Sequence, residues 1–199
     1  GEWTYFANDT AYHYEKFSRK YDKLINIWGA DHIGYISRMK SIVDVISNKT
    51  NYLEIFICQI VRLIKNNKLL KMSKRSGNFI ELKEIYNEVG KDPLRYFMVS
   101  SKSDSPMDFN LDKVIERNKD NPVFYCQYAY ARASSIIRKS NEIESFKNFD
   151  QSFDNFYPSL ISEHEWKIIL KLITWPYVLK QTAETKQPHR LTNYLEDLC

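Results

Sequence analysis

Cysteine is scarce in this chain of 199 residues, and its three cysteines lie far apart. Cys58, Cys126 and Cys199 form no Cys-x-x-Cys pair. A disulfide framework or a zinc site built from thiolates is therefore not expected, and this usage fits a reducing cytosol, so we predict a cytoplasmic protein. The four histidines are scattered without the spacing of metal ligands, so no protein-bound metal is predicted either.

Long apolar runs are also missing, so no segment is expected to cross a membrane, and no signal peptide is visible. The composition is 43% hydrophobic and 27% charged, which predicts a globular fold, and the length allows one or two domains. The net charge of +4 permits nucleic-acid binding without requiring it. This charge is unevenly spread, because the segment 62–75 carries six cations and no acid.

The first half of the chain has the pattern of alternating strands and helices. An apolar run from Leu24 to Trp28 ends at Gly29 and lies between two stretches with helical spacing, 8–21 and 33–47. This order predicts a buried parallel strand, a tight turn and a helix, the unit of a doubly wound α/β domain.

The segment 53–64 is rich in β-branched residues and predicts a second strand. Asn66 and Asn67 favour a hairpin turn, from which residues 68–72 would return. From Glu81 onward only helices are expected. Their start and stop signals are Gly90 after a helix over 82–89, the cap-and-proline pairs Asp92-Pro93 and Asn121-Pro122, a helix over 163–173, a break at Trp175-Pro176 and a new start near Pro188.

The segment Lys71-Met-Ser-Lys-Arg75 is the strongest chemical signal. Two lysines three residues apart on a Ser/Gly-rich loop can stay paired with a polyphosphate while its negative charge is redistributed. Most basic loops, however, only face solvent. This segment resembles the Lys-Met-Ser-Lys-Ser signature of class I aminoacyl-tRNA synthetases, with Arg75 at the position of the last serine. The resemblance implies that Lys74 is catalytic and stabilises the triphosphate during adenylate formation, that Lys71 assists, and that Met72 and Ser73 help to bind ATP.

The resemblance extends along most of the first 140 residues. Four blocks occur in the order found in arginyl-tRNA synthetases of the bacterial type, and Asp92-Pro-Leu-Arg95 resembles the sequence that names their helical anticodon-binding domain. The blocks are 4–13, 27–35, 71–79 and 121–132. The implied fold is α/β plus all-α. Residues 1–105 would be the second half of a doubly wound, Rossmann-like catalytic domain, and 106–199 the start of the helical domain.

Tyr5 and Asp9 are four residues apart and would share one helix face. A carboxylate can bind a guanidinium bidentately, and a phenol ring can pack on it. The resemblance implies that this pair recognises the arginine substrate. On the residues alone, Tyr5 could equally be a core residue and Asp9 a helix cap.

Gly29, Asp31 and His32 follow the first predicted strand, at the edge where open α/β sheets bind ligands. The resemblance implies that all three line the ATP site and that Asp31 also contacts arginine. Asp31 could instead cap the next helix or accept a hydrogen bond from a ribose hydroxyl.

The other class I signature, His-x-Gly-His, is absent, because His32-Ile-Gly-Tyr35 lacks the final histidine. Members of the family carry that motif upstream of the position that corresponds to Gly1. We therefore expect an internal fragment that does not activate arginine alone.

The resemblance implies an arginine–tRNA ligase, with L-arginine, ATP accompanied by Mg²⁺, and tRNA(Arg) as partners, in a monomeric enzyme. One alternative is another class I synthetase such as the cysteinyl enzyme. That enzyme uses a zinc–thiolate site, which this chain does not offer, and Asp9 argues for a cationic substrate. The other alternative is a tRNA-binding fragment without catalytic activity.

Overall fold

A computed structural model describes residues 4–70, 72, 80–143 and 162–199. The chain divides into two compact units, one of residues 1–62 with 103–108 and the other of 63–102 with 109–199. The predicted boundary at residue 105 stays a prediction. The elements are α1 (Tyr5–Ser18), β1 (Leu24–Gly29), η1 (Ala30–Tyr35), α2 (Ile36–Ser47), β2 (Leu53–Cys58), β3 (Val61–Lys65), β4 (Lys68–Leu69), α3 (Leu82–Val89), α4 (Lys91–Ser100), β5 (Met107–Asn110), η3 (Lys113–Ile115), α5 (Pro122–Glu142), α7 (Glu163–Ile173), α8 (Trp175–Thr185) and α9 (His189–Leu198).

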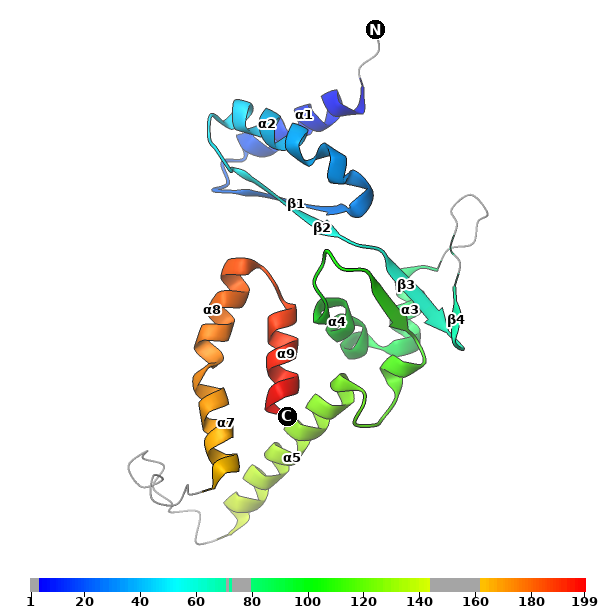
Figure 1. Cartoon of the computed structure of the whole chain (residues 1–199), viewed down its shortest axis with the longest axis vertical. Helices are drawn as coiled ribbons and strands as arrows, with labels where there is room; N and C mark the ends of the chain where they lie inside the picture. Colours follow the sequence, from blue (N-terminus) through cyan, green and yellow to red (C-terminus); the bar gives the residue numbers. More distant parts are fainter. Residues whose placement is uncertain (1–3, 71, 73–79, 144–161) are drawn as a thin grey trace. The chain divides into compact units, whose positions relative to one another are not determined.

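The first unit contains the predicted strand–turn–helix. Strands β1 and β2 are parallel, with Leu24 opposite Leu53, and η1 and α2 form the connection between them. Helices α1 and α2 lie on the same face of this strand pair (Figure 1). Between the helices and the strands lies a small apolar core of Leu24, Met39, Val43, Tyr52 and Leu53.

Strand β1 is only partly buried, which differs from the prediction of a buried parallel strand. Leu24 and Asn26 are buried against the helices, whereas Ile25 and Ile27 are 47% and 71% exposed. Successive side chains of a strand point to opposite faces, and only one face of β1 is covered by the described residues.

The predicted strand over 53–64 is divided. Strand β2 ends at Cys58, and β3 begins at Val61 and forms a three-stranded sheet in the order β4–β3–β5. Asn66 and Asn67 adopt the left-handed conformation, with φ of 52° and 56°, so the predicted hairpin turn is confirmed. The prediction of helices alone after Glu81 is wrong at β5, a four-residue strand that extends the sheet on the other side of β3.

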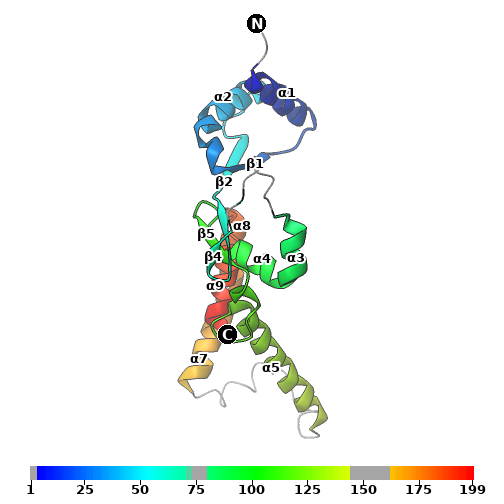
Figure 2. The same ribbon diagram turned by 90° about the vertical axis from the view of Figure 1, so that its right-hand side faces the viewer.

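The second unit is mostly helical. Asn121 caps α5 as predicted, because its side-chain oxygen accepts a hydrogen bond from the Val123 amide at 3.0 Å. Helix α9 packs against α4, α5 and α8, while the C-terminal half of α5 extends away from α9 (Figure 1 and Figure 2). No helix in the described part of the chain is long and apolar enough to span a membrane.

The junction between α3 and α4 turns at Gly90. Helix α4 begins at Lys91, so Asp92 lies in its first turn and does not cap it as predicted. Gly90 combines φ of 83° with ψ of 170°, a conformation open almost only to glycine. This backbone therefore makes Gly90, and not Asp92, the residue that separates the two helices.

Replacing Gly90 with alanine is expected to lower the free energy of unfolding by about 1–3 kcal/mol, because an L-residue is strained in this conformation. A Cβ at Gly90 meets no atom within 4 Å, so the loss measures backbone strain alone. Gly34→Ala is the matched control, since its Cβ is equally unobstructed and its φ is not positive. Equilibrium urea unfolding checks both variants, and equal stabilities would contradict the explanation.

Candidate functional site

A pocket of about 580 Å³ lies between α1 and β1 in the first unit. Helix α1 contributes Tyr5 and Asp9, strand β1 contributes Trp28, and the residues that follow the strand contribute His32 and Tyr35. The pocket therefore extends toward the carboxyl end of β1, where open parallel sheets bind their ligands.

Tyr5 and Asp9 lie one turn apart on α1, and both line the pocket, as the spacing predicts. Tyr5 is 87% exposed, so it is not a core residue of the first unit. The N-cap of α1 is Thr4, which excludes the alternative that Asp9 caps this helix. Both side chains are therefore available to a ligand.

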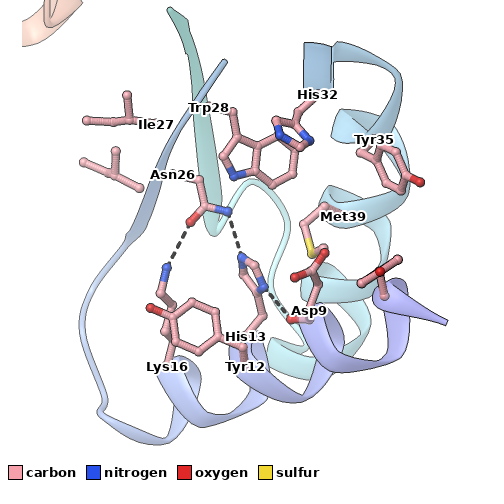
Figure 3. Close-up of a pocket in the computed structure, with 12 residues that line it drawn as sticks. Asp9, Tyr12, His13, Lys16, Asn26, Ile27, Trp28, His32, Tyr35 and Met39 are labelled. Carbon is pink, nitrogen blue, oxygen red and sulfur yellow. Dashed lines mark hydrogen bonds between the residues drawn. The ribbon is translucent and has the colours of Figure 1, made fainter. Parts of the chain in front are cut away.

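A chain of hydrogen bonds forms the floor of the pocket (Figure 3). The Lys16 ammonium donates to the Asn26 side-chain oxygen at 3.0 Å, and the Asn26 amide nitrogen lies 2.8 Å from His13 Nε2. His13 Nδ1 lies 2.7 Å from the backbone oxygen of Asp9. A carbonyl can only accept, so Nδ1 carries the proton and Nε2 accepts from Asn26.

These hydrogen bonds join α1 to β1 through two buried polar side chains. His13 is 4% exposed and Asn26 is 6% exposed. Their hydrogen bonds hold the helix turn that carries Asp9 against the strand. From the sequence, His13 was only one of four scattered histidines, and Asn26 was not identified as a site residue. The available signal was an asparagine inside an otherwise apolar strand, which needs a partner when buried.

Replacing His13 with alanine is expected to lower the free energy of unfolding by about 2–3 kcal/mol, because the buried Asn26 amide nitrogen loses its acceptor. His32→Ala removes the same ring from a site where the side chain is 57% exposed, and its effect should stay within about 0.5 kcal/mol. Urea unfolding of the two variants makes the comparison. Similar losses of unfolding free energy in both variants would mean that the buried hydrogen bonds of His13 contribute no special stability.

Gly29, Asp31 and His32 lie together at the carboxyl end of β1. A Cβ on Gly29 would lie 2.7 Å from a carboxylate oxygen of Asp31, so the absence of a side chain lets Asp31 fold back over the strand end. The other Asp31 oxygen lies 3.6 Å from His32 Nε2. The N-cap of η1 is Gly29 and that of α2 is Tyr35, so Asp31 is the cap residue of neither helix.

The structure brings only some of the predicted site residues together. His32 lines the pocket with Tyr5 and Asp9, while Gly29 and Asp31 adjoin it. Met72 is exposed. Lys71, Ser73 and Lys74 lie outside the described residues, so their roles stay predictions from the sequence.

Arg38 of α2 contacts the ring of Tyr35, which lines the pocket, and the ring of Phe6. Its guanidinium carbon lies 5.6 Å from the centre of the Phe6 ring and 5.5 Å from the centre of the Tyr35 ring. Such contacts with aromatic faces are attractive and restrain the Tyr35 ring. Within residues 4–70, 72, 80–143 and 162–199, no three His, Cys, Asp or Glu side chains are grouped so that they could hold a metal ion.

A parallel strand pair with a helical connection, and a pocket toward the carboxyl end of β1, is the pattern of a ligand-binding doubly wound α/β domain. Comparison with family models identifies which proteins of this fold the chain is similar to. The model for class I tRNA synthetases (I, L, M and V) matches residues 1–112, and the DALR anticodon binding domain matches 126–199. The chain belongs to the class I aminoacyl-tRNA synthetase family, as its sequence resemblance implied.

The most informative relatives are named arginine–tRNA ligases. The protein from Ruegeria pomeroyi is 45% identical over the whole chain, and that from Parvibaculum lavamentivorans is 43% identical. The chain spans 34% of the length of each.

Two solved structures share the fold. One, from Campylobacter jejuni, is assigned as an arginyl-tRNA synthetase and is 34% identical to this chain, with a TM-score of 0.81. The match covers 100% of this chain and 42% of the Campylobacter jejuni chain. The arginyl-tRNA synthetase of Thermus thermophilus has a TM-score of 0.62 at 19% identity, over 90% of this chain and 32% of its own, and supports the fold alone. The predicted fold class, a class I catalytic segment followed by a helical DALR domain, is confirmed.

Proposed function

We propose that the full-length protein is an arginine–tRNA ligase, which activates L-arginine with ATP and transfers it to tRNA(Arg). The observation that carries this proposal is the pairing of Asp9 and Tyr5 in one pocket near the carboxyl end of β1. The 45% identity to a named arginine–tRNA ligase supports the same substrate.

A guanidinium group fits the chemistry of this pocket. The Asp9 carboxylate can accept two parallel N–H donors, and the exposed Tyr5 ring can pack on the guanidinium plane. Trp28 and Tyr35 add aromatic walls for the aliphatic part of the substrate. Neutral and acidic amino acids would leave Asp9 unpaired or repelled once water is excluded, so the pocket favours a cationic side chain.

The nucleotide would lie beyond the end of β1. Gly29 permits a close approach of backbone to ligand, and Asp31 is 81% exposed at its side chain and available to a ribose hydroxyl or to the arginine ammonium. His32 would contribute a ring beside the nucleotide. Met72, Ser73 and Lys74 would contact ATP from the signature segment, and Mg²⁺ would arrive with the ATP phosphates.

The first step joins the arginine carboxylate to the α-phosphorus of ATP. The carboxylate oxygen attacks in line, the bond to the bridging oxygen breaks, and pyrophosphate leaves with its electron pair. Positioning by Asp9 and Tyr5, and charge stabilisation of the leaving group by Lys71 and Lys74, would be the contributions of this chain. In the second step a ribose hydroxyl at the 3′ end of tRNA(Arg) displaces AMP, and the DALR segment would bind the tRNA.

ATP–pyrophosphate exchange by the full-length protein tests the proposal. Exchange should depend on arginine, and on tRNA(Arg) as well if activation requires it, and cysteine and methionine should not replace arginine. Exchange with another amino acid would identify a different class I synthetase. A protein that binds tRNA without supporting exchange or aminoacylation would be a non-catalytic tRNA-binding protein. A cytoplasmic location and a monomeric state stay predictions.

The chain of 199 residues alone is expected to support no arginine-dependent exchange, because it contains no His-x-Gly-His segment. The same assay should give a signal with the full-length protein and none above background with the purified chain. Appreciable exchange by the chain would contradict the assignment of half of the catalytic groups to sequence outside it.

A further inference from the structure

Helix α1 is fixed to the rest of the first unit through few side chains. His13 is the one buried residue of α1, a helix that is described along its whole length, while Phe6 and Phe17 are only partly buried against the apolar core. Asp9 lies one turn before His13 on the same helix. The place of Asp9 in the pocket therefore depends on how His13 is held.

The imidazole ring of His13 acts as a rigid spacer. Its Nδ1 lies 2.7 Å from the Asp9 backbone oxygen, and its Nε2 lies 2.8 Å from the Asn26 side-chain nitrogen (Figure 3). The Tyr12 ring meets the His13 ring edge-on, with 5.8 Å between the ring centres. Because an imidazole cannot bend, its two hydrogen bonds fix the distance from the Asp9 turn to strand β1.

Asn26 is itself held in one orientation. The Lys16 ammonium donates to the Asn26 side-chain oxygen at 3.0 Å, so the amide nitrogen is turned toward His13. Asn26 also lies opposite Ile55 in the parallel pair of β1 and β2, which fixes its backbone. The connection from strand to helix is therefore constrained at both of its ends.

The same strand leads to the proposed nucleotide site. Gly29 follows Asn26 by three residues and ends β1 opposite Cys58 of β2. Three residues of strand span roughly 10 Å. The groups proposed for arginine lie on α1, and those proposed for ATP follow β1. The hydrogen bonds of His13 and Asn26 connect these two elements.

We propose that His13 and Asn26 are positioning residues that set the distance between the arginine-binding helix α1 and the nucleotide end of β1. This inference rests on the proposed function, because it assigns arginine to Asp9 and ATP to the strand end. Neither side chain takes part in the chemistry. Each acts through Asp9, whose carboxylate determines where the bound arginine lies.

The reaction requires such a fixed distance. The arginine carboxylate must lie in line with the α-phosphorus of ATP, and a displacement of about 1 Å can lower the rate by about a hundredfold. A small shift of α1 on β1 would move Asp9 and arginine together, while the nucleotide end of β1 would stay paired with β2.

Two substitutions in the full-length protein separate the spacing from the hydrogen bonds themselves. Asn26→Leu keeps the approximate size of the side chain and removes both of its hydrogen bonds to α1. His13→Gln keeps a donor and an acceptor and suits a helix, but replaces the rigid ring with a flexible chain. Circular dichroism and urea unfolding verify that each variant is folded, and His13→Gln carries the test if Asn26→Leu is not.

ATP–pyrophosphate exchange gives the first readout. The kcat/KM for arginine should fall by about tenfold or more in Asn26→Leu and by several-fold in His13→Gln, because arginine is displaced. The KM for ATP should stay within about twofold in both, because distant and independent sites affect each other little. A general loosening of the fold would instead raise the KM values for both substrates.

The Asp9→Asn background gives the second readout. In that background, Asn26→Leu or His13→Gln should lower kcat/KM by less than about twofold, because residues that act through one group are not additive. Tyr52→Phe is the matched control. Tyr52 is 4% exposed and its hydroxyl donates to the Tyr21 carbonyl, so this variant loses a buried hydrogen bond of the same unit that does not involve Asp9. Its effect should be small and equal in both backgrounds.

The outcomes distinguish this inference from the proposed function. A full-length protein without arginine-dependent exchange would overturn both. If Asp9→Asn lowers exchange while Asn26→Leu and His13→Gln behave as Tyr52→Phe does, the proposed function stands and the positioning role is overturned. Losses of the same size with and without Asp9→Asn would also overturn it.

Discussion

Asp9→Asn in the full-length protein should lower kcat/KM for arginine in ATP–pyrophosphate exchange by about a hundredfold or more. The substitution keeps the shape of the side chain and removes its charge. Loss of one partner from a desolvated, hydrogen-bonded charge pair costs about 2–5 kcal/mol, and each 1.4 kcal/mol is a factor of about ten. Steady-state exchange at varied arginine concentration, with ATP saturating, measures the loss.

Asp22→Asn is the matched control, because it removes the same charge from an exposed position that does not line the pocket. Its kcat/KM should stay within about twofold of the unsubstituted enzyme, since an exposed charge interacts only weakly through water. Equal losses in both variants would mean that net charge, and not contact with arginine, explains the effect of Asp9.

Lys74→Ala in the full-length protein should lower kcat for pyrophosphate exchange by about 10²–10³-fold with little change in the KM for arginine. Removing one group that stabilises charge in the transition state typically has an effect of this size. An interaction made mainly in the transition state affects kcat, whereas uniform binding affects KM. Pre-steady-state measurement of pyrophosphate release gives the rate of the chemical step directly.

Lys68→Ala is the control for this variant, because Lys68 lies in β4, in the hairpin that precedes the signature segment. It should leave kcat nearly unchanged. A Lys74→Ala enzyme with unchanged kcat and a raised KM for ATP would contradict the catalytic role and leave Lys74 as a simple binding residue.

Short sequence signals were sufficient to predict the ends and turns of several elements. The side chain of Asn121 caps α5, and Asn66 and Asn67 form the hairpin turn, because short-range backbone conformation decides these features. Gly90 also stopped α3 where expected. The cap predicted at Asp92 failed because Gly90 adopts a conformation that lets α4 begin at Lys91, two residues before Pro93.

Features that depend on distant segments were missed. Strand β5 forms because β3 has an open edge that the segment around Phe109 can join, and its four residues give no strand pattern of their own. In the same way, β1 is apolar at every position but Asn26 and Gly29, yet the described residues bury only one of its faces. Apolar composition alone does not reveal how many layers cover a sheet.

In the candidate site, too, contacts between neighbouring residues could be predicted, whereas contacts between distant segments could not. Tyr5 and Asp9 could be paired from their spacing, and the resemblance to arginyl-tRNA synthetases supplied their chemistry. The hydrogen bonds from Lys16 through Asn26 to His13 could not be predicted, because they join a helix and a strand through side chains with no shared sequence spacing.

The central claim is that Asp9 binds the guanidinium of arginine. Citrulline provides the most direct measurement, because it has nearly the same shape and lacks the positive charge. In pyrophosphate exchange by the full-length protein, the ratio of kcat/KM for arginine to that for citrulline should exceed about a hundredfold, and Asp9→Asn should reduce that ratio by at least about tenfold. A ratio that is unchanged by Asp9→Asn would contradict the claim.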